Sequence, residues 1–132
     1  MHTINPILID ILVPVAGAGG VENVINAVGK YLNHNGFHVR IVQLLSDGNR
    51  WFDPELEVYP ILIGKKAPTL DFLSELYANF LSQYGVPNIV IATTWPYLVM
   101  TAKKALAAST VPCKIVSWLH GPLYEYDRYG AG

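Results

Sequence analysis

The fold of this chain is decided by residues 7–45, ILIDILVPVAGAGGVENVINAVGKYLNHNGFHVRIVQLL. Ile7–Val13 is an almost continuous aliphatic run between two prolines, which is typical of a strand buried on both faces of a parallel sheet. Apolar side chains then recur at helical spacing from Val21 to Leu32, and Asn35-Gly36 provides a stop. Because Val39–Leu45 is a second aliphatic run, the stretch predicts a strand, a helix of about four turns and a second strand.

The rest of the chain repeats this alternation of strands and helices. The expected elements are a strand at Glu57–Ile63, a helix capped by Thr69 and ended by Gly85, a strand at Asn88–Thr93, a helix that begins at Thr94 or Trp95 with Pro96 in its first turn, and a strand at Lys114–Leu119. Pro60 lacks a ladder donor, so we expect its strand at a sheet edge. The alternation predicts a single α/β domain over residues 1–132, with a Rossmann-like, doubly wound, mostly parallel sheet flanked by helices. Such sheets bind ligands beyond the carboxyl ends of their strands.

The composition excludes several classes of function. Of the 132 residues, 52% are hydrophobic and 14% are charged, and the net charge is −1. Lysine and arginine gather only as the pairs Lys65-Lys66 and Lys103-Lys104, so we expect no nucleic-acid binding by a basic face. The N-terminal segment lacks a basic region and is interrupted by Asp10 and Pro14, which favours a strand over a signal peptide.

A few isolated residues allow further predictions. Cys113 is the single cysteine, so it forms no intrachain disulfide, and we expect it to be a small buried residue. Asp10 stands within an aliphatic strand, either as a buried structural acid or as a residue near the ligand cleft, and we expect the former. His2, His34 and His38 have no partners at metal-ligand spacing, so we expect no metal site.

Three glycines, Gly17, Gly19 and Gly20, stand where the first strand passes into the first helix. A dinucleotide-binding fingerprint is disfavoured, because Glu22 takes its sixth position and the second strand does not end in an acidic residue. A Walker loop is excluded, since no lysine followed by serine or threonine comes after the glycines. The remaining interpretations are a phosphate or sugar bound at the helix N-terminus, or a tight turn without a ligand.

Three segments in this order resemble a known family: GGVENV at 19–24, NGFHV at 35–39 and IVSWLHGP at 115–122. They are similar to the N-terminal half of the family 4 glycosyltransferases of the GT-B fold, whose pattern is a GG-x-E loop, a helix, an N/R-G-H/F-x-V turn and a strand that ends in histidine. The matches span residues 6–122, and the W-x-H form resembles members that build polysaccharide or lipopolysaccharide.

The resemblance implies retaining transfer of a hexosyl group from a nucleotide sugar, expected to be linked to uridine diphosphate, without a metal or other cofactor. The acceptor would be a glycan or lipid-linked saccharide, and the setting would be cytoplasmic, with peripheral contact at the inner membrane face. The resemblance implies a catalytic role for His120 and substrate or donor contacts for Gly17, Gly19, Gly20, Glu22, Trp118 and Gly121. From the residues alone, His120 could equally bond a neighbouring carbonyl, and Trp118 and the tyrosines at 124, 126 and 129 could pack on the sheet.

The donor-binding domain of that family has no counterpart in these 132 residues, and the chain ends without a helix after its last strand. We therefore expect this chain to be inactive alone, as the N-terminal part of a longer enzyme or as the acceptor subunit of a split one. Two alternatives stay open: a non-catalytic Rossmann-like binding or interaction module, and a domain that binds a nucleotide cofactor.

Overall fold

The computed structural model describes residues 5–15, 20–46, 52–64, 69–94 and 97–119. The elements in chain order are β1 (Leu8–Val15), α1 (Gly20–His34), β2 (His38–Leu45), β3 (Glu57–Pro60), α2 (Leu70–Tyr84), β4 (Ile89–Thr94), α3 (Tyr97–Leu106) and β5 (Lys114–Leu119). The five strands form one parallel sheet in the order β3-β2-β1-β4-β5. The predicted α/β, Rossmann-like, doubly wound sheet is confirmed.

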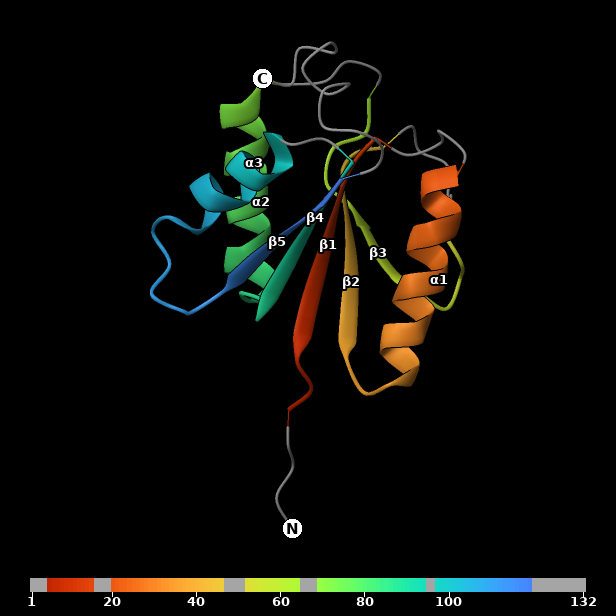
Figure 1. Ribbon diagram of the computed structural model, residues 1–132. Coiled ribbons are helices and arrows are strands. Elements are labelled where there is room, and N and C mark those ends of the chain that lie inside the picture. The colour runs from red at the N-terminus through yellow and green to blue at the C-terminus, as the bar shows by residue number, and fades with distance from the viewer. Residues whose placement is uncertain (1–4, 16–19, 47–51, 65–68, 95–96, 120–132) are drawn as a thin grey trace.

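Helices cover both faces of the sheet, with α1 on one face and α2 and α3 together on the other (Figure 1). Alternate residues of each strand therefore enter two separate cores, which explains why these strands are aliphatic at almost every position. On the α1 face the core contains Ile9, Ile11 and Val13 of β1, and on the opposite face it contains Leu12 of β1.

The connection between β2 and β3 completes the layer on the α1 face. Phe52 and Leu56 of this connection are buried in the same core as Ile25 of α1. Polar contacts join the connection to the helix: the backbone N–H of Asp53 donates to Asn26 Oδ1 at 2.8 Å, and Lys30 Nζ lies 3.1 Å from Asp53 Oδ2. Hydrophobic burial and these contacts together hold α1 against β2 and β3.

The strand order reverses between β1 and β4. The chain winds outward from β1 through β2 to β3, then crosses back along α2 to β4 and continues outward to β5. At such a reversal the loops that follow the two central strands diverge to opposite faces, and a crevice opens at their carboxyl ends. The fold therefore places a candidate ligand site beyond the carboxyl ends of β1 and β4.

A buried polar network joins β1, β2 and α2. Asp10 is fully buried and accepts from Arg40 Nε at 2.6 Å, from Arg40 Nη2 at 2.9 Å and from the Tyr77 hydroxyl at 2.6 Å. Arg40 also donates to the carbonyl oxygens of Tyr84 and Gly85, both at 2.9 Å, where α2 ends. Asp10 is thus a structural acid, as expected, and its partners lie far away in sequence.

Burial raises the pKa values of two groups in this network. Burial raises the pKa of the Asp10 carboxyl above its ordinary value, and the hydrogen bonds from Arg40 and Tyr77 oppose that shift. Burial, followed by the nearby Asp10 charge, raises the pKa of Tyr77, so its hydroxyl remains a donor.

The predicted ends of most elements are close to those observed. Thr69 caps α2 by accepting from the backbone N–H of Phe72 at 3.2 Å, and Gly85 ends α2 with a φ of 95°. Gly36 follows α1 with a φ of 91°, as expected of a glycine stop. The strand that contains Pro60 is the sheet edge beside β2, and the final strand covers the predicted residues. The predicted first turn at 94–96 lies largely outside the described residues.

Other details differ from the sequence predictions. β1 continues through Pro14 to Val15. Pairing of β1 with β4 already ends at Leu12, so the backbone N–H that Pro14 lacks is not needed for a hydrogen bond to β4. β3 ends at Pro60, and its predicted continuation contributes only an isolated bridge between Ser46 and Ile63.

The exposure of individual side chains also departs from expectation. Val24 and Tyr31, assigned from their spacing to the buried side of α1, are 42% and 67% exposed. The buried stripe of α1 is centred on Ile25, so these two positions lie on its outer flank. Cys113 is only partly buried against the α2 side of the sheet, and burial raises the pKa of its thiol.

Loss of the buried cation should destabilise the whole sheet. Arg40→Leu leaves the Asp10 carboxylate buried without its partner, so we expect the free energy of unfolding in urea to fall by about 3–5 kcal/mol. Lys104→Met removes an exposed partner of Asp71 and should cost less than about 1 kcal/mol. If both variants lost the same amount of unfolding free energy, the buried Asp10–Arg40 pair would contribute no more to stability than an exposed ion pair.

Candidate functional site

One row of residues crosses the sheet near its carboxyl edge. Gln43 of β2 pairs in register with Val13 of β1, and Thr93 of β4 pairs with Trp118 of β5. Leu12 is the last β1 residue paired with β4, opposite Ala92, so Val13 and Thr93 occupy the next position. Val13 belongs to the core on the α1 face. The other side chains of this row therefore point to the α1 face as well.

The row places polar side chains beside the reversal point of the sheet. Gln43 is 2% exposed and Thr93 is fully buried. The Thr93 hydroxyl donates to the carbonyl oxygen of Leu12 at 2.7 Å, which joins β4 to β1 across the reversal. Trp118, at the β5 end of the row, is partly exposed.

Gln43 carries a buried donor that finds no partner among the described residues. Among the residues that the structure describes, nothing accepts a hydrogen bond from Gln43 Nε2. A buried donor that is left unsatisfied costs about 1–3 kcal/mol. The Gln43 amide thus marks a position on the α1 side of the sheet where a hydrogen-bond acceptor would be favourable.

The first turn of α1 lies over the same face. Gly20 is the first residue of α1, and Glu22 is an acidic residue of its first turn that is only 4% exposed. An acidic side chain near a helix N-terminus is stabilised by the helix dipole. The same N-terminus presents backbone N–H groups without helical acceptors, which favour an anionic or polar ligand.

Only some of the predicted site residues lie within the described part of the chain. Gly20 and Glu22 lie at the start of α1, and Trp118 lies in the row at the carboxyl edge. The other predicted site residues, Gly17, Gly19, His120 and Gly121, lie outside the described residues, as do the tyrosines at 124, 126 and 129. Their roles stay predictions.

Gln43 and Thr93 were not among the predicted site residues. Each is a polar residue near the end of an otherwise aliphatic strand, in IVQLL and IVIATT. That interruption was a signal that could have identified them, because a polar side chain inside a strand buried on both faces needs a structural or functional partner.

The two histidines within the described residues, His34 and His38, lie away from this edge. His38 begins β2 and lies 3.0 Å from Glu57, and His34 ends α1 and lies 3.4 Å from Glu55, both near the amino edge of the sheet. No group of three or more histidine, cysteine, aspartate or glutamate side chains suited to a metal ion occurs among the described residues.

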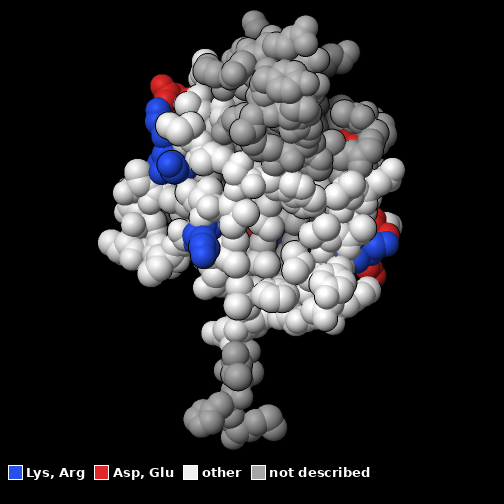
Figure 2. Space-filling view, in the orientation of Figure 1, with Lys and Arg blue, Asp and Glu red and all other residues white. Residues whose placement is uncertain are grey.

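The molecular surface carries few charges. On the face shown in Figure 2, the charged side chains form small groups separated by uncharged surface, and no continuous basic patch is present among the residues described there. None of the helices in the described part of the chain has the length and apolar character needed to cross a membrane. Among the described residues, the carboxyl edge offers neutral hydrogen-bonding groups, the buried Glu22 carboxylate and the N-terminus of α1.

Comparison with known proteins gives a structural likeness. No protein-family model matches the chain, and no curated protein matches it in sequence. The structure is similar to that of the lipopolysaccharide outer core galactosyltransferase WaaB in its apo form, with a TM-score of 0.68 and 21% sequence identity. The likeness covers 94% of this chain and 36% of that chain, so this chain spans about a third of that protein's length. At this identity the likeness shows the shared α/β, Rossmann-like fold.

Removing the buried Gln43 amide should stabilise the protein. Gln43→Leu keeps the approximate size of the side chain and eliminates the buried donor, so we expect the free energy of unfolding to rise by about 1 kcal/mol. Thr93→Val breaks the hydrogen bond to Leu12 and should lower the free energy of unfolding by about the same amount. Chemical denaturation of both variants tests this, and a clear loss of stability in Gln43→Leu would mean that the amide is already satisfied.

Proposed function

We propose that this chain is the acceptor-binding domain of a retaining glycosyltransferase with a GT-B fold, of the family 4 type. The observation that carries the proposal is its likeness to the galactosyltransferase WaaB over 94% of this chain. The ordered segments at 19–24, 35–39 and 115–122 support the same assignment independently of the coordinates. A fold alone does not define an activity, so the assignment depends on the site as well.

The carboxyl edge has groups suited to a saccharide acceptor. A sugar hydroxyl both donates and accepts hydrogen bonds, and the Gln43 amide offers a buried donor with no partner among the described residues. Trp118 lies three strands from Gln43 along the same row and presents an aromatic ring, which suits the apolar face of a sugar. The acceptor in this proposal is a glycan or a lipid-linked saccharide of cell-surface polysaccharide or lipopolysaccharide synthesis.

The donor in this proposal is a sugar linked to uridine diphosphate. Its phosphates approach the backbone of Gly17, Gly19 and Gly20, where N–H groups and the positive end of the α1 dipole favour negative charge. His120 contacts the transferred sugar, directly beyond β5, and Glu22 and Gly121 border the same cleft. The remaining donor contacts come from a second domain, in the same polypeptide or in a separate subunit.

The reaction transfers a hexosyl group with retention of configuration. The bond between the anomeric carbon and the donor phosphate oxygen breaks, and a bond to the acceptor oxygen forms on the same face of the sugar. The acceptor hydroxyl gives its proton to the departing phosphate oxygen, and uridine diphosphate leaves. No metal takes part, and the setting is the cytoplasm, with peripheral contact at the inner membrane face.

An activity measurement on the protein together with its donor-binding domain tests the proposal. We expect release of uridine diphosphate from a UDP-hexose in the presence of a lipid-linked saccharide. His120→Ala should lower kcat about 100-fold or more if the imidazole acts on the reacting sugar. His38→Ala, at the opposite edge of the sheet, serves as the matched control and should leave the rate unchanged.

Two outcomes would contradict the proposal in different ways. Full activity of His120→Ala would remove the catalytic role of that residue. Saccharide binding without transfer from any nucleotide sugar would favour a non-catalytic binding module.

A further inference from the structure

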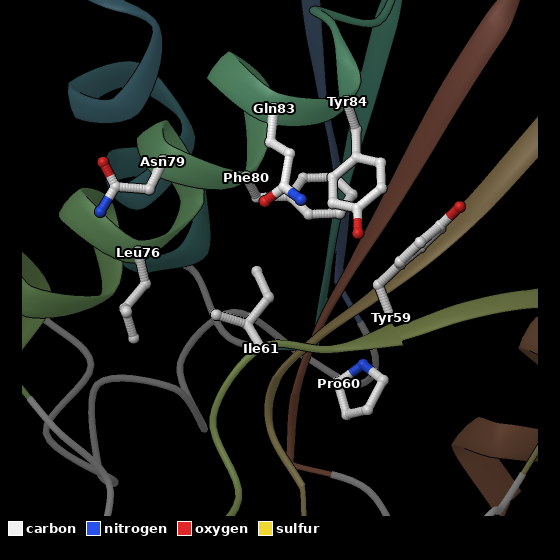
Figure 3. Close-up of a pocket in the computed structure, with 8 residues that line it drawn as sticks. All are labelled: Tyr59, Pro60, Ile61, Leu76, Asn79, Phe80, Gln83 and Tyr84. Atoms are coloured by element: carbon white, nitrogen blue, oxygen red, sulfur yellow. The ribbon is translucent and has the colours of Figure 1, made fainter.

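A hollow lies on the other face of the sheet, between the edge strand β3 and helix α2 (Figure 3). Its volume is about 310 Å³, which is within the range of small-ligand pockets. Tyr59 belongs to β3, where it pairs in register with Val42 of the core on the α2 face. Since Gln43 points to the α1 face, this hollow is separated from the carboxyl-edge row by the sheet itself.

Three aromatic rings form one end of the hollow. The ring centroids of Tyr59, Phe80 and Tyr84 lie 4.7 to 5.1 Å apart in pairs, in tilted or edge-to-face arrangements. Phe80 is buried, whereas Tyr84 is 47% exposed. The rings of Tyr59 and Tyr84 lie side by side at this end in Figure 3.

The buried polar network fixes this aromatic group in place. The Arg40 guanidinium lies 5.0 Å from the centroid of the Phe80 ring, a cation–π distance. The same guanidinium is held by Asp10 and by the carbonyl oxygens at the end of α2. Rings that are ordered before a ligand arrives lose little entropy when it binds.

Two primary amides line the α2 side of the hollow. Asn79 and Gln83 are four residues apart on α2, so their side chains share one side of the helix, and both are exposed. Each amide has two donor hydrogens and an acceptor oxygen. No charged side chain is among the residues that line the hollow within the described part of the chain.

This combination of groups selects a particular class of ligand. Aromatic rings suit the apolar C–H face of a sugar, and neutral amides suit hydroxyl groups that both donate and accept. A phosphate or carboxylate would find no free cation among the described residues that line the hollow, and the nearby Arg40 is committed to Asp10 and to α2. A purely apolar ligand would leave both amides unpaired.

We propose that this hollow is a binding site for a sugar unit of a neutral glycan, separate from the carboxyl-edge site. The binding itself does not depend on the proposed transfer reaction. If that reaction holds, the hollow retains a part of the acceptor chain that lies away from the reacting end, which raises the local concentration of acceptor.

Titration of the isotope-labelled chain with maltohexaose, cellohexaose and a β-1,4-galactan oligosaccharide tests this site by NMR. At least one of these probes should shift the side-chain amide signals of Asn79 and Gln83. Tyr84→Ala removes a stacking ring but keeps the carbonyl that binds Arg40, so we expect affinity to fall about fivefold to tenfold. Tyr84→Phe should bind nearly as well as the unaltered protein, since the ring is preserved.

Tyr31→Ala is the matched control, because Tyr31 is 67% exposed on α1 and lies outside the hollow. It should leave the affinity unchanged. The double variant Asn79→Ala/Gln83→Ala should weaken binding, measured from the backbone amide shifts of residues around the hollow, and intact folding of each variant is checked from its backbone spectrum.

The outcomes separate this proposal from the proposed transferase function. NMR shifts at the hollow without any transfer activity would support the sugar-binding site and contradict the proposed transferase function. Shifts confined to the carboxyl edge, or no shifts with any of the three probes, would contradict the sugar-binding site in the hollow. Neither result would contradict the proposed transferase function. Concentration-dependent dimerisation with shifts along β3 would also overturn it, because the surface would then be an interface between two copies.

Discussion

The structure depends on one buried ion pair, between Asp10 of β1 and Arg40 of β2. Both side chains are almost completely removed from water, and each finds further partners: the Tyr77 hydroxyl for the carboxylate, and the last carbonyl oxygens of α2 for the guanidinium. A buried charge without such partners would cost several kcal/mol, so the geometry of the two strands and the helix is tightly coupled. The network joins the central strand to the helix that carries the chain back across the sheet.

This arrangement separates stability from function along the strands. The amino halves of β1 and β2 contain the satisfied ion pair, whereas the carboxyl ends contain a buried amide for which the described residues offer no acceptor. A polar group kept in a core at a cost in stability is typical of a ligand site. The reversal of strand order between β1 and β4 places that group beside the crevice in which folds of this kind bind ligands.

Much of the fold could be predicted from the sequence, because aliphatic runs, helical spacing and glycine or proline stops are local signals. The burial of Asp10 also followed from its place within an aliphatic run. Its partner could not be predicted, since Arg40 lies 30 residues away and only the pairing of β1 with β2 brings the two together. Val24 and Tyr31 fit the helical spacing but lie on the flank of the buried stripe, which the sheet defines and periodicity alone does not.

The candidate site was predicted less completely than the fold. Trp118 and Glu22 were inferred from resemblance to a family, and the structure places them at the carboxyl edge and at the start of α1. Gln43 and Thr93 were missed because a single polar residue in a strand gives no indication of the face it occupies until the register is known.

A crystal structure of the protein with a bound saccharide acceptor would test the central claim, that the carboxyl edge at the β1–β4 reversal is a saccharide site, most directly. The account predicts one sugar unit against Trp118 and an oxygen atom of another unit of the same saccharide within hydrogen-bond distance of Gln43 Nε2. A saccharide bound only at other surfaces, with this edge closed by the protein's own side chains, would contradict it.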